Sequence, residues 1–443
     1  MTCTRQASDE QIRQAAVKVL RLNDLGTMTT AAPNLYPHMW SWDAAFVTIG
    51  LSRVSVPRAI QELRTLLSAQ WSTGMIPHIV FSDNATGYFP GPERWGTDSV
   101  AARPAGVRTS GICQPPVHAI ALRHVVDRGR ENGGSDQSAA EAFLEESFEQ
   151  WMAWHRWLVD ARDPDGTGLI EIHHGWESGF DNSPRWDAAY GRVRPGRVEP
   201  FTRRDTLHVA DAAQRPDDAE YTKYLWLVQQ MESVGYDDKL VPGLVDFRVR
   251  DVFFSAILAA SSDGLAGLAE EIGHSTEAAE LRRIASRFQN GVAATVDPVT
   301  GLARDYDVRA GEWISTRTVS GFAPLISGGE KALLEAQRDL LRGPEWMGYR
   351  GLAFALPPST SPGSPAFKPR TYWRGPVWPF LNLLLGWASR RNGQEELCGE
   401  LREASLCQLS DLAFGEYYEP FTGEPLGSLA QSWTAAAALE WLA

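Results

Sequence analysis

The feature that most constrains the fold is the recurrence of apolar residues at helical spacing along most of the chain. Apolar side chains three and four positions apart line one face of a helix, whereas the alternation typical of strands is almost absent. The pattern predicts about a dozen helices, at Gln11–Leu22, Ala44–Val54, Pro57–Ser72, Val117–Val126, Ala139–Val159, Ala219–Val234, Val249–Ile272, Thr276–Asn290, Glu330–Leu341, Val377–Arg391, Glu395–Ala413 and Leu429–Leu442. The pair Asp263-Gly264 is a candidate break within the seventh segment.

No stretch between these segments is long enough and rich enough in proline, glycine or serine to separate domains. The best candidate, residues 357–365 with four prolines, is short and typical of a loop. The 443 residues are enough for one large core. We therefore predict an all-α protein with a single domain over residues 1–443, in which helices pack on helices.

The charge balance limits the classes of partner. Forty-two basic residues against 55 acidic residues give a net charge of −13, which disfavours nucleic acid and anionic membranes. A small anionic substrate is still compatible, because it needs only a local arginine or tyrosine cluster. The segment Met1–Leu20 lacks the apolar stretch of a signal peptide, and the most apolar run, Val252–Ala260, is too short to span a bilayer. We expect a cytoplasmic protein.

Cysteines and histidines give no metal or redox signature. The four cysteines, Cys3, Cys113, Cys398 and Cys407, form no Cys-x-x-Cys pair. His173 and His174 lie beside acidic residues, but their spacing matches no zinc pattern. We predict neither a metal nor another cofactor.

The segment Trp176–Asp187 places three carboxylates and two indoles in twelve positions. Gly179 and Pro184 disfavour a helix or strand through its middle, so we predict a shaped loop. Acids beside flat aromatic faces suit a sugar: the ring packs on indole, its hydroxyls bond to carboxylates, and one acid protonates the glycosidic oxygen. Taken alone, the segment is equally compatible with an acidic surface loop over two buried tryptophans.

Polar and aromatic residues also gather where four predicted helices begin. These clusters are Trp40–Asp43, Ser110–Pro116, Tyr372–Pro379 and Ala430–Thr434. Any one of them is adequately explained as a helix cap with a core tryptophan, but all four are more simply explained if the helix starts meet around a shared pit. Two long non-helical stretches, residues 74–114 and 175–217, are typical of binding loops, and we expect one of them to close over a ligand.

A second acidic and aromatic segment, Phe414–Gly427, lies between the last two predicted helices. Glycoside hydrolysis needs two carboxyl groups, one to protonate the leaving oxygen and one to activate water or attack the anomeric carbon. Each of the two segments would supply one carboxyl group if they faced each other across the pit. On composition alone, Glu416, Glu419 and Glu424 are equal candidates for the second group.

Four motifs, with a fifth near the end of the chain, resemble glycoside hydrolase family 63. They are Trp-x-Trp-Asp at 40–43, Glu-Ser-Gly-Phe-Asp-Asn-Ser-Pro-Arg-Trp-Asp at 177–187, Tyr-Trp-Arg-Gly-Pro-Val-Trp-Pro at 372–379, Glu-Tyr-Tyr-x-Pro-x-Thr-Gly at 416–423, and Gln-Ser-Trp-Thr-Ala at 431–435. The resemblance covers nearly the whole chain and is strongest to small bacterial members that hydrolyse glucosylglycerate and mannosylglycerate. It implies an (α/α)6 barrel with long active-site loops at one end. It also implies inverting hydrolysis of the α-glycosidic bond of glucosylglycerate to glucose and glycerate.

The resemblance further implies roles for individual residues. Asp181 matches the general acid, Glu416 the general base, and Asp43 an acidic residue that helps to hold the sugar and the water. The sugar-contacting positions are Trp40, Trp42, Gln114, Trp373, Trp378 and Gln431, with Gly179 and Tyr372 as further substrate-binding candidates. The candidates for the rest of the ligand, including its carboxylate, are Tyr36, His78, Tyr88, Arg215 and Tyr221. Glu177 and Asp187 are expected to contact the sugar or to support residues that do.

Two physical expectations accompany these roles. Asp181 should be enclosed by apolar groups such as Phe180 and Trp186, so that it stays protonated near neutral pH. The two carboxyl groups should lie roughly 6.5–9.5 Å apart, leaving room for a water.

Several alternatives stay open. A trehalase or another α-glucosidase could use the same barrel. A sugar isomerase or epimerase would rely on histidines such as His173 and His174. A non-catalytic sugar-binding protein would use the acids only as hydrogen-bond acceptors. The sequence does not decide between gluco and manno substrates, and it leaves a homo-oligomer, dimer or tetramer, open.

Overall fold

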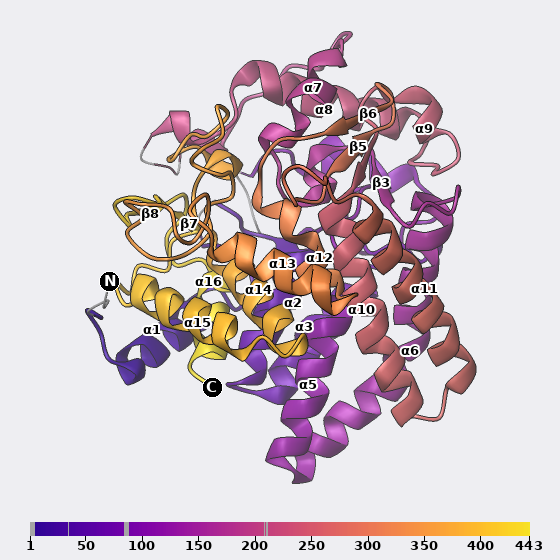
Figure 1. The fold of residues 1–443 in the computed structure, drawn as a ribbon. Coiled ribbons are helices and arrows are strands. Elements are labelled where there is room, and N and C mark those ends of the chain that lie inside the picture. The colour runs from indigo at the N-terminus through magenta and orange to yellow at the C-terminus, as the bar shows by residue number, and fades with distance from the viewer. Residues whose placement is uncertain (1–4, 34, 84–87, 208, 210) are drawn as a thin grey trace.

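The computed structural model describes residues 5–33, 35–83, 88–207, 209 and 211–443, and within them twelve helices form two concentric rings (Figure 1). Six inner helices contact one another in a closed circle: α2 (Ser41–Ser52), α5 (His118–Asn132), α10 (Val252–Glu271), α12 (Ala323–Ser327), α14 (Pro379–Arg391) and α16 (Ser432–Trp441). Six outer helices pack against them: α1 (Asp9–Leu22), α3 (Val56–Ser68), α6 (Gly134–Arg162), α11 (Ser275–Ala294), α13 (Lys331–Arg342) and α15 (Glu395–Leu409). Inner and outer helices alternate along the chain, so the fold is the expected (α/α)6 barrel.

The two rings differ in composition because they differ in burial. Every residue of α2 is buried, whereas α13 buries only Leu334, Gln337 and Leu341. Helix α10 is long and apolar enough to cross a membrane by length and composition alone, but it is an inner helix with 83% of its apolar stretch buried. Asp263-Gly264 does not break α10, which packs along its length on α11.

Two helices depart from the prediction. Helix α12 was not predicted, because its five residues are too few to show a helical period and all of them are buried. Helix α8 (Asp218–Ser233) was predicted, but it lies outside both rings. It belongs to the long connection between α6 and α10, together with α7 (Asp187–Arg192) and α9 (Val241–Leu244). A fourth short helix, α4 (Pro92–Trp95), lies in the 74–114 loop.

The few strands are short and lie in the loops. An antiparallel sheet has the order β3 (Ile170–Ile172), β4 (Val249–Asp251), β5 (Asp305–Asp307) and β6 (Glu312–Ile314). In its register Glu171 lies opposite Arg250, and Arg250 opposite Tyr306. The residues of β4 were predicted to begin a helix, but α10 starts one residue after them, with Asp251 as its N-cap. In Figure 1, strands β3, β5 and β6 lie with α7, α8 and α9 at one end of the barrel, opposite the α5–α6 turn.

Two further strand pairs support the loops that carry the predicted motifs. Strand β1 (Met39–Trp40) pairs with β2 (Ile79–Val80), which joins the first motif to the 74–114 loop. Strand β7 (Tyr417–Tyr418) pairs with β8 (Pro425–Leu426), which folds the second acidic segment into a hairpin directly after Glu416.

Candidate active site

A cavity that opens to solvent, with about 800 Å³ of empty space when its solvent-filled mouth is included, lies where four of the inner helices begin. The starts of α2 and α16 supply Asp43 and Gln431, and the residues before α5 and α14 supply Gln114 and Tyr372. The four helix-start clusters therefore meet around one pit, as the sequence analysis suggested. The two acidic segments add Asp181 and Glu416.

Fourteen of the sixteen predicted site residues line this cavity. They are Tyr36, Trp40, Trp42, Asp43, His78, Tyr88, Gln114, Gly179, Asp181, Arg215, Tyr221, Tyr372, Glu416 and Gln431. They come from segments that are far apart in the sequence, so the fold gathers them. Within the 74–114 and 175–217 loops, residues 84–87, 208 and 210 lie outside the described part of the chain.

The other two, Trp373 and Trp378, do not line the cavity. Their rings stack on each other with centroids 3.7 Å apart and planes 2° apart, and each residue is only 1% exposed. They lie behind Tyr372, whose ring is 5.4 Å from that of Trp378. In this structure they pack behind the tyrosine that faces the cavity, and the expectation that they contact the sugar stays a prediction.

Several lining residues were not among the predicted site residues. Trp176 lies in the acidic segment Trp176–Asp187, and Trp433 lies in the helix-start cluster Ala430–Thr434. These two segments were the sequence signal that could have identified them. Trp95 packs with its ring centroid 5.9 Å from that of Trp176, but its short helix α4 gave no periodic signal. Asp205 also lines the cavity, where Arg203 pairs with it through two hydrogen bonds. The remaining three are Ala31, Phe89 and Pro216.

Asp181 is partly exposed to the cavity and otherwise enclosed by protein. This enclosure raises the pKa of Asp181 to about 7, although the hydroxyl of Tyr372, which donates to Oδ2 at 3.2 Å, favours the charged form. On the apolar side, Phe180 packs against Trp373 with ring centroids 4.2 Å apart. A carboxyl group with this pKa is suited to donating a proton near neutral pH.

Glu416 has very different surroundings. Its side chain is 1% exposed and pairs with Arg215 at 2.7 Å. The hydroxyl of Tyr36 donates to Oε1 at 2.9 Å, and the backbone N–H of Ser428 donates to Oε2 at 3.1 Å. These partners all stabilise a carboxylate, which is the form that a general base requires.

The two carboxyl groups do not touch each other. Tyr372 contacts Asp181, Tyr36 contacts Glu416, and the two tyrosine hydroxyls lie 3.4 Å apart. A chain of two hydroxyls therefore joins the carboxyl groups along the cavity wall.

Asp43 also lines the cavity, from the first turn of α2. Burial raises its pKa well above the ordinary value, and the charges of Glu416 and Asp181 raise it further. Asp43 is thus favoured as a neutral hydrogen-bonding group beside the two other carboxyl groups.

The competing acids have structural contacts. Glu419 accepts hydrogen bonds from the backbone N–H groups of Phe421 and Thr422, and Glu424 pairs with Arg370 at the surface. Of the three glutamates in this segment, only Glu416 lines the cavity.

The expected supporting residues and the two histidines also lie outside the cavity wall. Asp187 pairs with Arg374 at 2.6 Å, and Glu177 is fully buried against Arg162. His173 contacts Glu171 at 3.1 Å, and His174 contacts the backbone oxygen of Tyr224 at 3.1 Å. Burial lowers the pKa of His174 to about 4, so it stays neutral.

Comparisons with known proteins find glycoside hydrolases. A family profile described as the mannosylglycerate hydrolase MGH1-like glycoside hydrolase domain matches residues 36–434. The chain is 53% identical to a glucosylglycerate hydrolase from Mycolicibacterium hassiacum, over 98% of each chain. It is 39% identical to mannosylglycerate hydrolase MGH1 from Selaginella moellendorffii, over 98% of this chain and 86% of the relative. The crystal structure of a family 63 mannosylglycerate hydrolase from Thermus thermophilus, in complex with Tris and D-glycerate, superposes with a TM-score of 0.88 at 37% identity, over 97% and 99% of the two chains.

Proposed function

The chain belongs to the MGH1-like group of glycoside hydrolase family 63, and from this premise we propose that it hydrolyses the α-glycosidic bond of glucosylglycerate, with inversion, to give glucose and glycerate. The observation that carries the proposal is the pair Asp181 and Glu416. They line one cavity in environments that favour opposite protonation states. Hydrolysis needs this difference between an acid and a base.

In the proposed reaction, the carboxyl group of Asp181 donates its proton to the glycosidic oxygen as the bond to the sugar breaks. Glu416 accepts a proton from a water, and the water oxygen forms the new bond at the anomeric carbon from the opposite face. Glu416 ends protonated and Asp181 ionised, so a proton must return to Asp181 and leave Glu416 before the next turnover. Asp43 is suited to bind a sugar hydroxyl or the water beside Glu416.

The proposed substrate carries a carboxylate on its glycerate part, and Arg215 is our candidate for the cation that binds this carboxylate. Arg215 lines the cavity and is 3% exposed. Its guanidinium pairs with Glu416 and contacts the hydroxyl of Tyr36, while Nε has no hydrogen-bond partner among the described residues. We propose Arg215, with Tyr88, His78 and Tyr221, for the glycerate end of the ligand, and Trp40, Trp42, Gln114 and Gln431 for the sugar end.

A substrate panel tests the proposal. The purified protein is incubated separately with glucosylglycerate, mannosylglycerate and trehalose, and the released sugar is measured. We expect glucose from glucosylglycerate, and the mannosylglycerate arm measures the choice between gluco and manno substrates. Absence of sugar release from glucosylglycerate, or faster release from trehalose, would overturn the assignment.

Two variants and one control connect the activity to the site. Asp181→Asn and Glu416→Gln should fold and lose about 10²- to 10⁴-fold in kcat, because each removes one proton-transfer group. Glu424→Gln, in the surface pair with Arg370, should keep normal activity.

Proton NMR of the first product should show β-glucose; initial release of the α-anomer would contradict inversion. A cytoplasmic location and a homo-oligomeric state are further predictions.

A further inference from the structure

The placement of Asp181 depends on the segment that carries it, because Tyr372 provides the only side-chain hydrogen bond among the described residues to its carboxyl group. Four residues earlier, Glu177 is fully buried in a short 3-10 turn. Its carboxylate accepts hydrogen bonds from two guanidinium nitrogens of Arg162, at 2.8 and 3.0 Å, and from the backbone N–H of His173 at 2.7 Å. Burial alone would raise the pKa of Glu177, but Arg162 and His173 together more than offset it and the pKa lies below the ordinary value. The buried pair is therefore charged.

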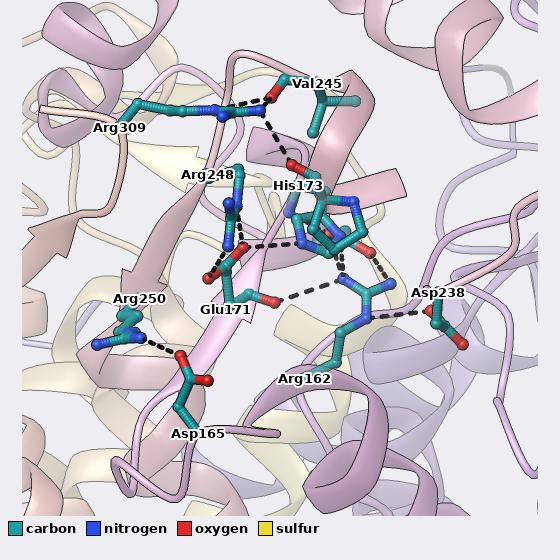
Figure 2. Close-up of polar contacts among 11 residues, drawn as sticks. Arg162, Asp165, Glu171, His173, Asp238, Val245, Arg248, Arg250 and Arg309 are labelled. Carbon is teal, nitrogen blue, oxygen red and sulfur yellow. Dashed lines mark hydrogen bonds and ion pairs between the residues drawn. The ribbon is translucent and has the colours of Figure 1, made fainter. Parts of the chain in front are cut away.

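Arg162 is itself held from several sides, as Figure 2 shows. It is the last residue of α6, its Nη1 contacts His173 Nδ1 at 3.2 Å, and its Nε lies 3.6 Å from Asp238. His173 in turn contacts Glu171 on β3, which pairs with Arg248 next to β4. The ion pair thus fixes the start of the segment to an outer helix and to the four-stranded sheet.

The segment is also held on the other side of Asp181. The indole N–H of Trp186 donates to the backbone oxygen of Phe180 at 3.0 Å. The buried guanidinium of Arg185 lies 3.0 Å from Asp305 on β5 and 3.4 Å from Asp251 on β4. Asp181 therefore lies between two buried ion pairs, Glu177–Arg162 before it and Arg185–Asp305 after it. Both ion pairs are connected to the four-stranded sheet.

We propose that Glu177, through its ion pair with Arg162, is a positioning residue that aims the carboxyl group of Asp181 at the glycosidic oxygen. Neither Glu177 nor Arg162 lines the cavity, so neither touches the substrate. A displacement of about 1 Å at a reacting group can cost about 100-fold in rate, so a small rearrangement of this turn is enough to lower turnover. This inference rests on the proposed role of Asp181 as general acid.

The test compares two substrates that differ in their need for an acid. Glucosylglycerate has a poor leaving group that must be protonated, whereas fluoride leaves from α-glucosyl fluoride with little help. Glu177→Gln should lose about 10- to 100-fold in kcat on glucosylglycerate, with KM changed less than about 3-fold, and lose less than about 3-fold on the fluoride. Asp181→Asn should show the same selectivity with a larger loss.

Glu62→Gln is the matched control. Glu62 is also fully buried, pairs with an arginine, Arg58, at 2.8 Å, and accepts a backbone N–H, but it lies on α3 away from the Asp181 segment. It should lower the thermal unfolding temperature and leave the ratio of activities on the two substrates unchanged. If Glu177→Gln does not fold, Arg162→Lys replaces it in the test, since lysine keeps the charge but contacts only one carboxylate oxygen at a time.

The outcomes separate this inference from the proposed function. Equal losses on both substrates, or no loss on either, would overturn the positioning role while Asp181→Asn still discriminates between them. If Asp181→Asn itself lost activity equally on both substrates, the general-acid assignment would be wrong, and the inference would be overturned with it.

Discussion

At the scale of single residues, the site separates two carboxyl groups by their neighbours. Asp181 has one tyrosine hydroxyl and a wall of aromatic rings, whereas Glu416 has a guanidinium, a hydroxyl and a backbone N–H. Enclosure raises the pKa of Asp181 more than the nearby Arg215, which pairs with Glu416 instead, lowers it, and so favours the neutral acid, whereas a directly paired cation favours the carboxylate. The chemical difference between the two groups therefore comes from residues far away in the sequence.

The pH dependence of activity should reflect the acid. Because the pKa of Asp181 is raised to about 7 and only its protonated form donates, kcat/KM should fall as the pH rises through about 7. Tyr372→Phe removes a hydrogen bond that favours the charged form, so this alkaline limb should move to higher pH. The pH–rate profiles of both proteins, with Tyr306→Phe on β5 as control, measure the shift. A limb that stays in place or moves to lower pH would contradict this account of the acid.

The cation beside Glu416 makes a second prediction. Arg215→Met leaves the buried carboxylate of Glu416 without its ion pair and without the guanidinium that holds it in place, so kcat should fall. Removing one partner of a buried pair should also cost about 3–5 kcal/mol of stability. Arg370→Met, in an exposed pair with Glu424, should cost at most about 1 kcal/mol. Urea unfolding and turnover measurements test the two effects, and equal stability of the two variants would contradict the argument.

The sequence motifs indicated the two segments that contain the acid and the base. Residue types alone could not decide which glutamate of the second segment is the base. Glu416, Glu419 and Glu424 share one segment, and only the hairpin of β7 and β8 shows that Glu416 lines the cavity while Glu419 caps a turn. Trp373 was expected to contact the sugar because of its motif. The stacking that places it behind Tyr372 is a tertiary contact with no local signal.

At the scale of elements, long periodic helices were predicted because a helix with one apolar face repeats its signal over several turns. Most bounds were close, but the predicted end of α5, Val126, falls short of Asn132, and the predicted start of α6, Ala139, comes after Gly134. The short elements were not predicted. Helix α12 has too few residues to repeat the signal, and β4 was merged with α10 because its three residues are too few to show a strand alternation and continue directly into the helix. Helix α8 was predicted as a helix, but its position outside the rings depends on packing that periodicity does not encode.

The hairpin that carries Glu416 depends on one glycine. Gly427 has a φ of +70°, and a Cβ there would lie 2.3 Å from Glu416 Oε2. Gly427→Ala should therefore displace the carboxylate and lower kcat by about 10- to 100-fold. Gly106→Ala is the matched control, because Gly106 has a φ of +79° with no atom within 4 Å. It should cost about 1 kcal/mol of stability and leave kcat unchanged. Equal activities of the two alanine variants would show that the close contact is not needed.

At the scale of the whole molecule, the barrel is closed by its first and last inner helices. Helix α16 packs on α2, and the chain ends are joined around them: Asn23 donates to the backbone oxygen of Ala430 at 2.9 Å, and Ser432 donates to that of Thr30 at 2.7 Å. The alternating order of helices was readable from the sequence, but this closure was not, since it joins residues about 400 positions apart. The signals for it were the resemblance to a barrel family and the two polar and aromatic clusters, Trp40–Asp43 and Ala430–Thr434, at the starts of these helices.

The contact between α2 and α16, the α2–α16 seam, also reaches the active site. Asp43 lies in the first turn of α2, and Gln431 immediately precedes α16. The two helices lie in close contact at Gly50, where a Cβ would lie 2.4 Å from the Cα of Ala436. A backbone atom cannot rotate away, so Gly50→Ala must push the helices apart. We expect a loss of about 1–3 kcal/mol in the free energy of unfolding, together with reduced turnover as the two sides of the cavity separate.

Gly267→Ala provides the control, because Gly267 lies within inner helix α10 and a Cβ there meets no atom within 4 Å. Alanine should raise the stability of that helix by about 0.5–1 kcal/mol and leave activity unchanged. Urea unfolding followed by circular dichroism gives the free energies, and turnover of glucosylglycerate gives the functional effect. If Gly50→Ala matched Gly267→Ala in both measurements, the α2–α16 seam would tolerate separation, and the rigidity of the cavity would have to come from the loops above it.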